Sequence, residues 1–114
     1  MKMIIAVIKP SRLDAVLDAV TQAGATGLTV TEVRGYGRQK GKTEVYRGTE
    51  YEVKLLPKVR LEIAVAEDML DTVREALATA ANTGKIGDGK IFVIDLEAAL
   101  RIRTGEMDLA AISG

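Results

Sequence analysis

The chain has 114 residues, a common size for a single domain, and its 16 basic and 16 acidic residues give a formal net charge of zero. This balance argues against broad electrostatic binding of nucleic acid, which needs a basic face. The absence of cysteine and histidine excludes disulfides, thiolate chemistry, histidine-dependent nucleophiles and the usual zinc ligands. No apolar run approaches the roughly 18 residues of a membrane span, and the N-terminal segment lacks a signal-peptide cleavage site, so we expect a cytoplasmic protein.

The first half of the chain predicts a strand, a helix and a second strand. Residues 3–8 form a continuous apolar run, typical of a central strand buried on both faces. Ser11 and Asp14 then predict a capping box, and Gly24 stands where the glycine after a helix is expected. Residues 28–33 are rich in β-branched side chains and predict a strand. The apolar stripe of the intervening helix is Leu13, Val16, Leu17 and Val20.

The second half repeats this order of elements. Residues 58–66 alternate in polarity, which predicts a strand with one face formed by Val59, Leu61, Ile63 and Val65. A helix with the stripe Met69, Leu70, Val73 and Leu77 follows and is expected to end at Gly84. After the glycine-rich turn 87–89, residues 91–96 predict another buried strand. In the final segment Arg101 and Arg103 alternate along a short predicted strand, so both would point to one side, and the rest is expected to be a loose tail.

Two βαβ units joined by a long loop predict an α+β fold of the ferredoxin-like type, the split arrangement βαββαβ. In this fold a four-stranded antiparallel sheet carries both helices on one face, so the other face has to be covered or used for function. The small residues Ala64 and Ala66 favour covering by another subunit, and we expect self-association. The domain is expected to span residues 1–106, followed by a tail at 107–114.

The long stretch between the second and third predicted strands, residues 35–57, has neither helical nor sustained strand periodicity. It holds all three tyrosines of the chain, Tyr36, Tyr46 and Tyr51. A structureless loop of about 20 residues is uncommon in a compact domain and is usually functional or disordered. The residues alone leave open a disordered insertion, a β-hairpin and a functional loop.

Three clusters of basic residues, two of them with glycines, are candidate anion sites. Glycines let backbone N–H groups approach an anion, and Lys and Arg supply charge. Residues 84–90 match the G-x-x-x-x-G-K skeleton of a P-loop, but Ile91 stands where that motif needs Ser or Thr, and the predicted helix precedes it. We reject the P-loop, and glycine-rich turns are more often only turns. The clusters are Gly35, Gly37, Arg38, Gln39, Lys40 and Gly41; Gly84, Lys85, Gly87, Gly89 and Lys90; and Arg101 and Arg103.

Two segments resemble the two signatures of the PII nitrogen regulatory proteins: YRGTEY at 46–51 and TGKIGDGKIFV at 83–93. Shorter matches are VIKP at 7–10, GRQKG at 37–41, LPKV at 56–59 and RIRTGE at 101–106. Two long motifs in the right order and spacing make the resemblance specific, and it spans the chain to about Glu106. The chain departs from the family pattern at Val7, Thr49, Lys54 and Ala64. The changes in the loop bear on the choice of partner and not on the nucleotide site.

The resemblance implies a homotrimer that binds ATP or ADP in the clefts between its subunits. The adenine would contact Thr29 and Ala64, and 2-oxoglutarate would bind beside a magnesium ion held by Gln39 and ligand oxygens. The residues themselves fit this, since Gln39 offers an oxygen donor and Lys58 can pair with a carboxylate. The implied nucleotide-binding residues are Val7, Thr29, Gly35, Gly37, Arg38, Glu62, Ala64, Gly87, Asp88, Gly89, Lys90, Arg101 and Arg103. Those implied for 2-oxoglutarate are Gly37, Gln39, Lys40, Gly41, Lys58 and Gly87.

The resemblance also implies that the loop at about 37–55 is an effector loop. Tyr51 would be its nucleotidylation site, and Arg47 would contact an ammonium transporter that recruits the protein to the inner face of the membrane. Further implied partners are a nucleotidyltransferase and nitrogen-assimilation enzymes or regulators, with no nucleic acid among them. The expected function is regulation in response to ATP, ADP and 2-oxoglutarate, with at most slow incidental ATP hydrolysis.

Two other functions stay open on the same fold. One is a small phosphotransferase or ATPase, although phosphohistidine transfer is excluded and no carboxylate pair stands out as acid and base. The other is an RNA-binding sheet, although residues 58–66 contain no aromatic side chain to stack on a base. We rank the regulator first. ATP binding that strengthens with 2-oxoglutarate would distinguish it from both.

Overall fold

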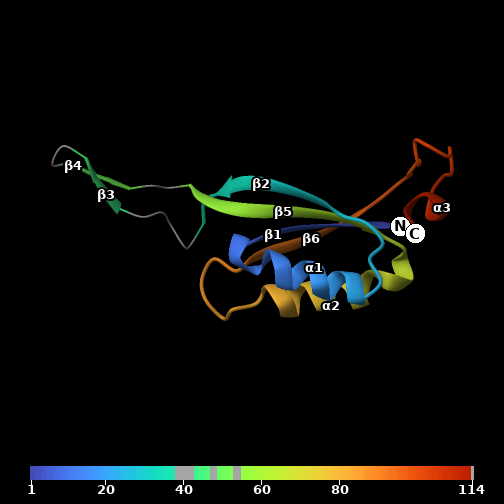
Figure 1. Cartoon of the computed structure of the whole chain (residues 1–114), viewed down its shortest axis with the longest axis horizontal. Helices are drawn as coiled ribbons and strands as arrows, with labels where there is room; N and C mark the ends of the chain where they lie inside the picture. The colour runs from blue at the N-terminus through green and yellow to red at the C-terminus, as the bar shows by residue number, and fades with distance from the viewer. Residues whose placement is uncertain (38–42, 47–48, 53–54, 114) are drawn as a thin grey trace.

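In the computed structural model, which describes residues 1–37, 43–46, 49–52 and 55–113, two helices pack on one face of a four-stranded antiparallel sheet (Figure 1). This arrangement confirms the ferredoxin-like fold. The strands, in sheet order, are β2 (Thr29–Gly35), β5 (Leu56–Val65), β1 (Lys2–Ile8) and β6 (Gly89–Asp95). The helices are α1 (Leu13–Gln22) and α2 (Leu70–Ala81), preceded by the 3₁₀ turns η1 (Pro10–Arg12) and η2 (Glu67–Met69).

The helix-facing side of the sheet forms the hydrophobic core. Along β1 every second side chain, namely Ile4, Ala6 and Ile8, is at most 1% exposed, and β5 alternates in the same way. Burial of one such aliphatic side chain contributes about 1.5–3 kcal/mol. The two helical stripes predicted from the sequence face this core. The other buried side chains are Val16, Val20, Val59, Leu61, Ile63, Val65, Val73, Leu77 and Ala81.

The opposite side of the sheet, which we call the open face, is not covered by α1 or α2 (Figure 1). Met3 pairs with Ile94 and Ile5 pairs with Phe92, so these four side chains form an apolar strip across β1 and β6. Phe92 and Ile94 are each 51% exposed. The prediction that residues 91–96 form a buried strand is therefore wrong for this face, because no described part of the chain covers Phe92 and Ile94.

The ends of the helices match the sequence only in part. Gly24 has a φ of 108°, and the N–H groups of Gly24 and Ala25 bond to the carbonyls of Thr21 and Val20, which is the glycine-terminated helix end that was predicted. The predicted capping box at Ser11 does not form. Pro10 starts a 3₁₀ turn, so α1 begins only at Leu13, without a side-chain cap.

The end of α2 also differs from its prediction. The helix stops at Ala81, because Asn82 already has an extended backbone, so Gly84 does not end it. The Asn82 side-chain oxygen instead accepts a hydrogen bond from Gly84 N at 2.7 Å, and Gly84 has a φ of 76°. Gly84 therefore belongs to the turn that leads to β6.

The long stretch between β2 and β5 contains a short hairpin. Strands β3 (Thr43–Tyr46) and β4 (Thr49–Glu52) pair with each other, which agrees with the hairpin alternative, and the hairpin projects beyond one end of the sheet (Figure 1). Strands β2 and β5 also extend into the predicted loop, where Gly35 pairs with Leu56. Residues 38–42, 47–48 and 53–54 lie outside the described part of the chain.

The C-terminal segment is ordered where a loose tail was predicted. Leu100 forms a β-bridge with Met107, and α3 (Leu109–Ile112) follows. Thr26 donates a hydrogen bond of 2.8 Å to the Ile112 carbonyl, which ties α3 back to the chain between α1 and β2. Within the described residues, no helix is both long enough and apolar enough to cross a membrane.

Candidate functional site: two cavities of the sheet

The first cavity lies where β2, β5 and β6 meet the turn that precedes β6, and we call it the turn-side cavity. Its volume is about 480 Å³. It brings together predicted residues from four separate stretches of the sequence, although no single motif contains them all. Its lining residues are Val7, Gly35, Tyr36, Gly37, Leu56, Lys58, Ile86, Gly87, Gly89, Lys90 and Phe92.

Two glycines of this cavity are required by the backbone. Gly89 has a φ of 104°, and a Cβ placed there would lie 1.8 Å from the carbonyl oxygen of Val7. Gly87 has a φ of 97°, a conformation that other residues rarely adopt. The close approach at Gly89 seats the turn directly on β1, where Lys90 then pairs with Val7. The sequence predicted backbone proximity to an anion here, and the geometry adds proximity to β1.

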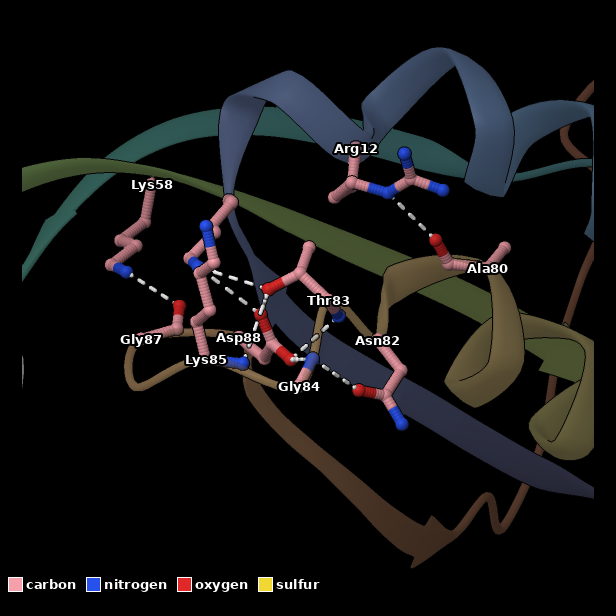
Figure 2. A network of polar contacts seen from close by, with 10 residues as sticks. Arg12, Lys58, Ala80, Asn82, Thr83, Gly84, Lys85, Gly87 and Asp88 are labelled. Atoms are coloured by element: carbon pink, nitrogen blue, oxygen red, sulfur yellow. Dashed lines mark hydrogen bonds and ion pairs between the residues drawn. The ribbon is translucent and has the colours of Figure 1, made fainter.

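The side chain of Asp88 points into its own turn (Figure 2). Its carboxylate accepts hydrogen bonds from Thr83 N at 2.7 Å, from Gly84 N at 3.0 Å and from the Thr83 hydroxyl. Lys9 adds an ion pair at 3.2 Å. The Thr83 hydroxyl, followed by the Thr83 N–H, Lys9 and the Gly84 N–H, holds the pKa of Asp88 well below its usual range against an opposing effect of burial. The carboxylate is therefore engaged within the turn.

Lys58 connects β5 to the same turn. Its ammonium donates a hydrogen bond of 2.8 Å to the Gly87 carbonyl (Figure 2). Burial lowers the pKa of Lys58, the positive charge of Lys9 lowers it further, and Asp88 opposes both. A partly desolvated lysine at the edge of a cavity is a strong partner for a carboxylate or phosphate, because little water has to be displaced.

The second cavity, which we call the tail-side cavity, lies beside the C-terminal segment and measures about 310 Å³. It collects the predicted adenine residues and one of the two predicted arginines. Glu62 forms an ion pair with Arg60 at 3.7 Å beside it. The lining residues are Met3, Thr26, Gly27, Leu28, Thr29, Glu62, Ala64, Arg101, Ala111 and Ile112.

The two predicted arginines do not point to one place. Arg101 follows Leu100 in the C-terminal hairpin, and its guanidinium bonds to the carbonyls of Ala111 at 3.2 Å and Ser113 at 2.7 Å. It also pairs with Glu106 at 3.2 Å. Arg103 lies in an exposed turn and lines neither cavity. The predicted strand alternation is wrong because residues 102–104 form the turn of the hairpin.

The predicted nucleotide residues thus separate into two groups on one chain. Val7 belongs to the turn-side cavity and Met3 to the tail-side cavity, and they lie four positions apart on β1, about 13 Å along a strand. Gly35, Gly37, Gly87, Gly89, Lys90 and Lys58 accompany Val7, whereas Thr29, Glu62, Ala64 and Arg101 accompany Met3. Two further predicted nucleotide residues, Asp88 and Arg103, line neither cavity. Of the other predicted residues, Arg38, Gln39, Lys40, Gly41 and Arg47, and the side chain of Tyr51, lie outside the described part.

Several residues at these cavities were not singled out from the sequence. Lys9 and Thr83 appeared only inside matching segments, because a lone lysine after a strand carries no pattern of its own. Phe92 and Ile86 in the first cavity, and Thr26 in the second, are recognisable only from strand register and chain packing. Among the described residues, no group of three or more Asp, Glu, His or Cys side chains is arranged to hold a metal ion.

Comparisons with known proteins agree on one family. A sequence model described as "Nitrogen regulatory protein P-II" matches residues 1–106. The chain is 60% identical over 112 residues to "Nitrogen regulatory protein P-II" of Rhizobium etli, covering 98% of this chain and 100% of that protein. With the same coverage, it is 59% identical to "Nitrogen regulatory protein P-II" of Klebsiella oxytoca and to "Nitrogen regulatory protein P-II 1" of Escherichia coli.

Proposed function

The chain belongs to the nitrogen regulatory protein P-II family, and we propose that it senses ATP, ADP and 2-oxoglutarate and passes the result to target proteins. The observation that carries this proposal is the division of the predicted nucleotide residues between two cavities of one chain. The turn-side cavity offers cations and glycine backbone suited to phosphates. The tail-side cavity offers Thr29 and the small Ala64 as contacts for a planar base.

We infer that one nucleotide uses both groups of residues by binding where the turn-side cavity of one subunit faces the tail-side cavity of another. Such a contact joins two different surfaces, and a heterologous contact of this kind closes into a ring when the rotation allows. The apolar strip of the open face supplies surface for burial between subunits. These features support a cyclic homotrimer with shared nucleotide sites.

The turn-side cavity also suits a dicarboxylate. Lys58 lies at its edge and donates a hydrogen bond to the Gly87 carbonyl, and a bound carboxylate would offer its ammonium a charge-assisted contact. A doubly charged acid next to a triphosphate needs a bridging cation. Magnesium would take its ligands from phosphate oxygens, 2-oxoglutarate oxygens and the amide oxygen of Gln39.

The output of the proposed regulator is the stretch from about 37 to 55. Ligands at Lys58 and Gly37 would lie at the root of this stretch and so favour one of its conformations. Partners, including an ammonium transporter, would contact the stretch through Arg47, and nucleotidylation of Tyr51 would add bulk and negative charge that block this contact. Deletion of residues 42–53 should leave ATP binding intact and abolish partner binding.

Calorimetric titration tests the sensing function. We expect ATP to bind the wild-type protein, and 2-oxoglutarate to bind only when magnesium and ATP are present, with each ligand tightening the other by the same factor. Tight binding of 2-oxoglutarate to the ATP-free protein would contradict the proposed arrangement. Absence of ATP binding would overturn the proposed function as a whole.

Subunit mixing tests whether the site is shared. Lys90→Ala damages only the turn-side cavity, and Arg101→Ala damages only the tail-side cavity. Neither variant alone should bind ATP well. In trimers reassembled from an equal mixture, about a quarter of the clefts should combine two intact halves and bind ATP. A mixture with no recovered binding, although mass spectrometry detects mixed trimers, would argue for a site within one subunit.

A further inference from the structure

One polar cluster, formed by Lys9, Thr83 and Asp88, lines neither of the two cavities. Lys9, just after β1, donates a hydrogen bond of 3.2 Å to the Thr83 hydroxyl and pairs with Asp88 at 3.2 Å. The side chains of Lys9 and Asp88 are only 17% and 23% exposed. Their attraction is therefore less screened by water and salt than that of an open surface pair.

The Asp88 side chain of this cluster joins the two ends of the turn formed by residues 83–88. The Asp88 carboxylate gathers the N–H groups of Thr83 and Gly84, and Figure 2 shows these bonds converging on one side chain. Lys9 then fixes the closed turn to the end of β1. Two independent strands of the sheet add to this, because Lys58 of β5 bonds to the Gly87 carbonyl and Gly89 abuts Val7 of β1.

Of the residues that line the turn-side cavity, Ile86 and Gly87 lie in this closed turn, and Gly89 and Lys90 follow it at the start of β6. We propose that Lys9 and Asp88 are positioning residues, which hold the 83–88 turn in its phosphate-binding shape without contacting the ligand through their side chains. The inference rests on the proposed function and adds to it a role for Lys9 and a different role for Asp88. Contacts within the chain itself close the turn, so binding does not have to order it.

Without the cluster, the turn would lose its fixed conformation and would have to become ordered when the ligand binds. Ordering a few residues on binding lowers affinity by about tenfold. The loss should fall on the phosphate half of the ligand, because the cluster supports only the turn-side cavity. Affinity for adenosine, whose base would use the tail-side cavity, should stay unchanged.

The competing explanation is that Lys9 contacts phosphate directly. Asp88→Asn separates the two roles. If Lys9 contacted phosphate directly, its release from Asp88 would leave triphosphate binding unchanged or strengthen it. If Lys9 and Asp88 position the turn together, Asp88→Asn weakens binding, and the double variant with Lys9→Met is no weaker than either single variant.

The experiment is calorimetric titration of the assembled wild-type and variant proteins with ATP, inorganic tripolyphosphate and adenosine. We expect Lys9→Met to lower the affinity for ATP and for tripolyphosphate by about tenfold and to leave the affinity for adenosine unchanged. Lys9→Arg should restore binding, since arginine keeps the charge and donors. The matched control is Arg74→Met, which removes another ion pair, with Asp71, on the outer surface of α2 and should change none of the three affinities.

The result has clear outcomes in each direction. Wild-type affinity of Lys9→Met for tripolyphosphate overturns the positioning role, and so does equal weakening of tripolyphosphate and adenosine. If Asp88→Asn does not fold, Lys9→Met and its rescue by Lys9→Arg decide the matter. Failure of the wild-type protein to bind ATP would instead remove the proposed function, which distinguishes the two failures.

Discussion

The two sides of the sheet contrast sharply, although the same four strands supply both. On the helix-facing side, Ile4, Leu61 and Ile63 are 0% exposed, whereas Phe92 and Ile94 on the open face are each 51% exposed. The first side is covered within one chain, whereas the second carries an apolar strip that α1 and α2 do not cover. The helix-facing side therefore carries the stability of the protomer, and we propose that the open face serves contacts with other molecules.

The largest effect should come from a cavity in the completed side. Leu61→Ala removes a fully buried side chain from β5, which costs about 3 kcal/mol. The loss should be the same at every protein concentration, because it concerns the core of a single chain. Urea denaturation at two concentrations measures this, and a loss that vanished at high concentration would contradict the division between the two sides.

A smaller and concentration-dependent effect should follow a change in the open face. Phe92→Ser removes half-exposed apolar surface, which is worth about 1–2 kcal/mol per subunit only if another subunit covers it. The variant should remain folded but dissociate at concentrations where the wild-type protein stays assembled. Analytical ultracentrifugation with circular dichroism measures both. Unchanged assembly would mean that another surface holds the subunits together.

The turn at the end of the open face should respond to pH. The folded-state pKa of Asp88 lies well below its ordinary value of 3.8, so its carboxylate stabilises the fold above that value. This contribution is lost as the pH falls towards the lowered pKa. Asp88→Asn should therefore be less stable than wild type at neutral pH, and the difference should shrink steadily below about pH 4. A constant difference in melting temperature across that range would contradict the prediction.

The smallest effect on stability should come from substitution of Lys58, which we expect to change ligand binding far more than the free energy of unfolding. Its pKa is lowered in the folded protein, chiefly by burial, so the charged form is disfavoured there and stability rises with pH only as Lys58 deprotonates. Lys58→Met removes that cost together with one hydrogen bond, and we expect a net change below about 1 kcal/mol. The same variant should lose 2-oxoglutarate binding. A large drop in melting temperature would show that Lys58 mainly supports the fold.

The element types and the core followed from local patterns. The alternation of residues 58–66 predicted β5, and the stripes at Val16, Val20, Val73 and Leu77 predicted both helices. Helix starts were less predictable, because Pro10 favoured a 3₁₀ turn over the capping box at Ser11. These are local competitions between two acceptable backbone arrangements, and small energy differences decide them.

The candidate site was predictable as a set of residues but not as an arrangement. The division into two cavities depends on the register between β1, β5 and β6, which pairs residues far apart in the sequence. Arg103 was misplaced because a hairpin turn replaced the expected strand. Lys9 was missed because its partners, Thr83 and Asp88, come more than 70 residues later.

The place of β1 in the sheet also has a consequence for how the chain reaches its fold. This strand is made first and lies in the centre, yet Lys2 pairs with Val65 on one side and Asp95 on the other. During synthesis, β1 therefore has neither neighbouring strand to pair with until β5 has been made, and it gains its second neighbour only with β6. Such non-local pairing slows folding, typically towards milliseconds or longer. Meanwhile the apolar run at its start is a natural target for a chaperone.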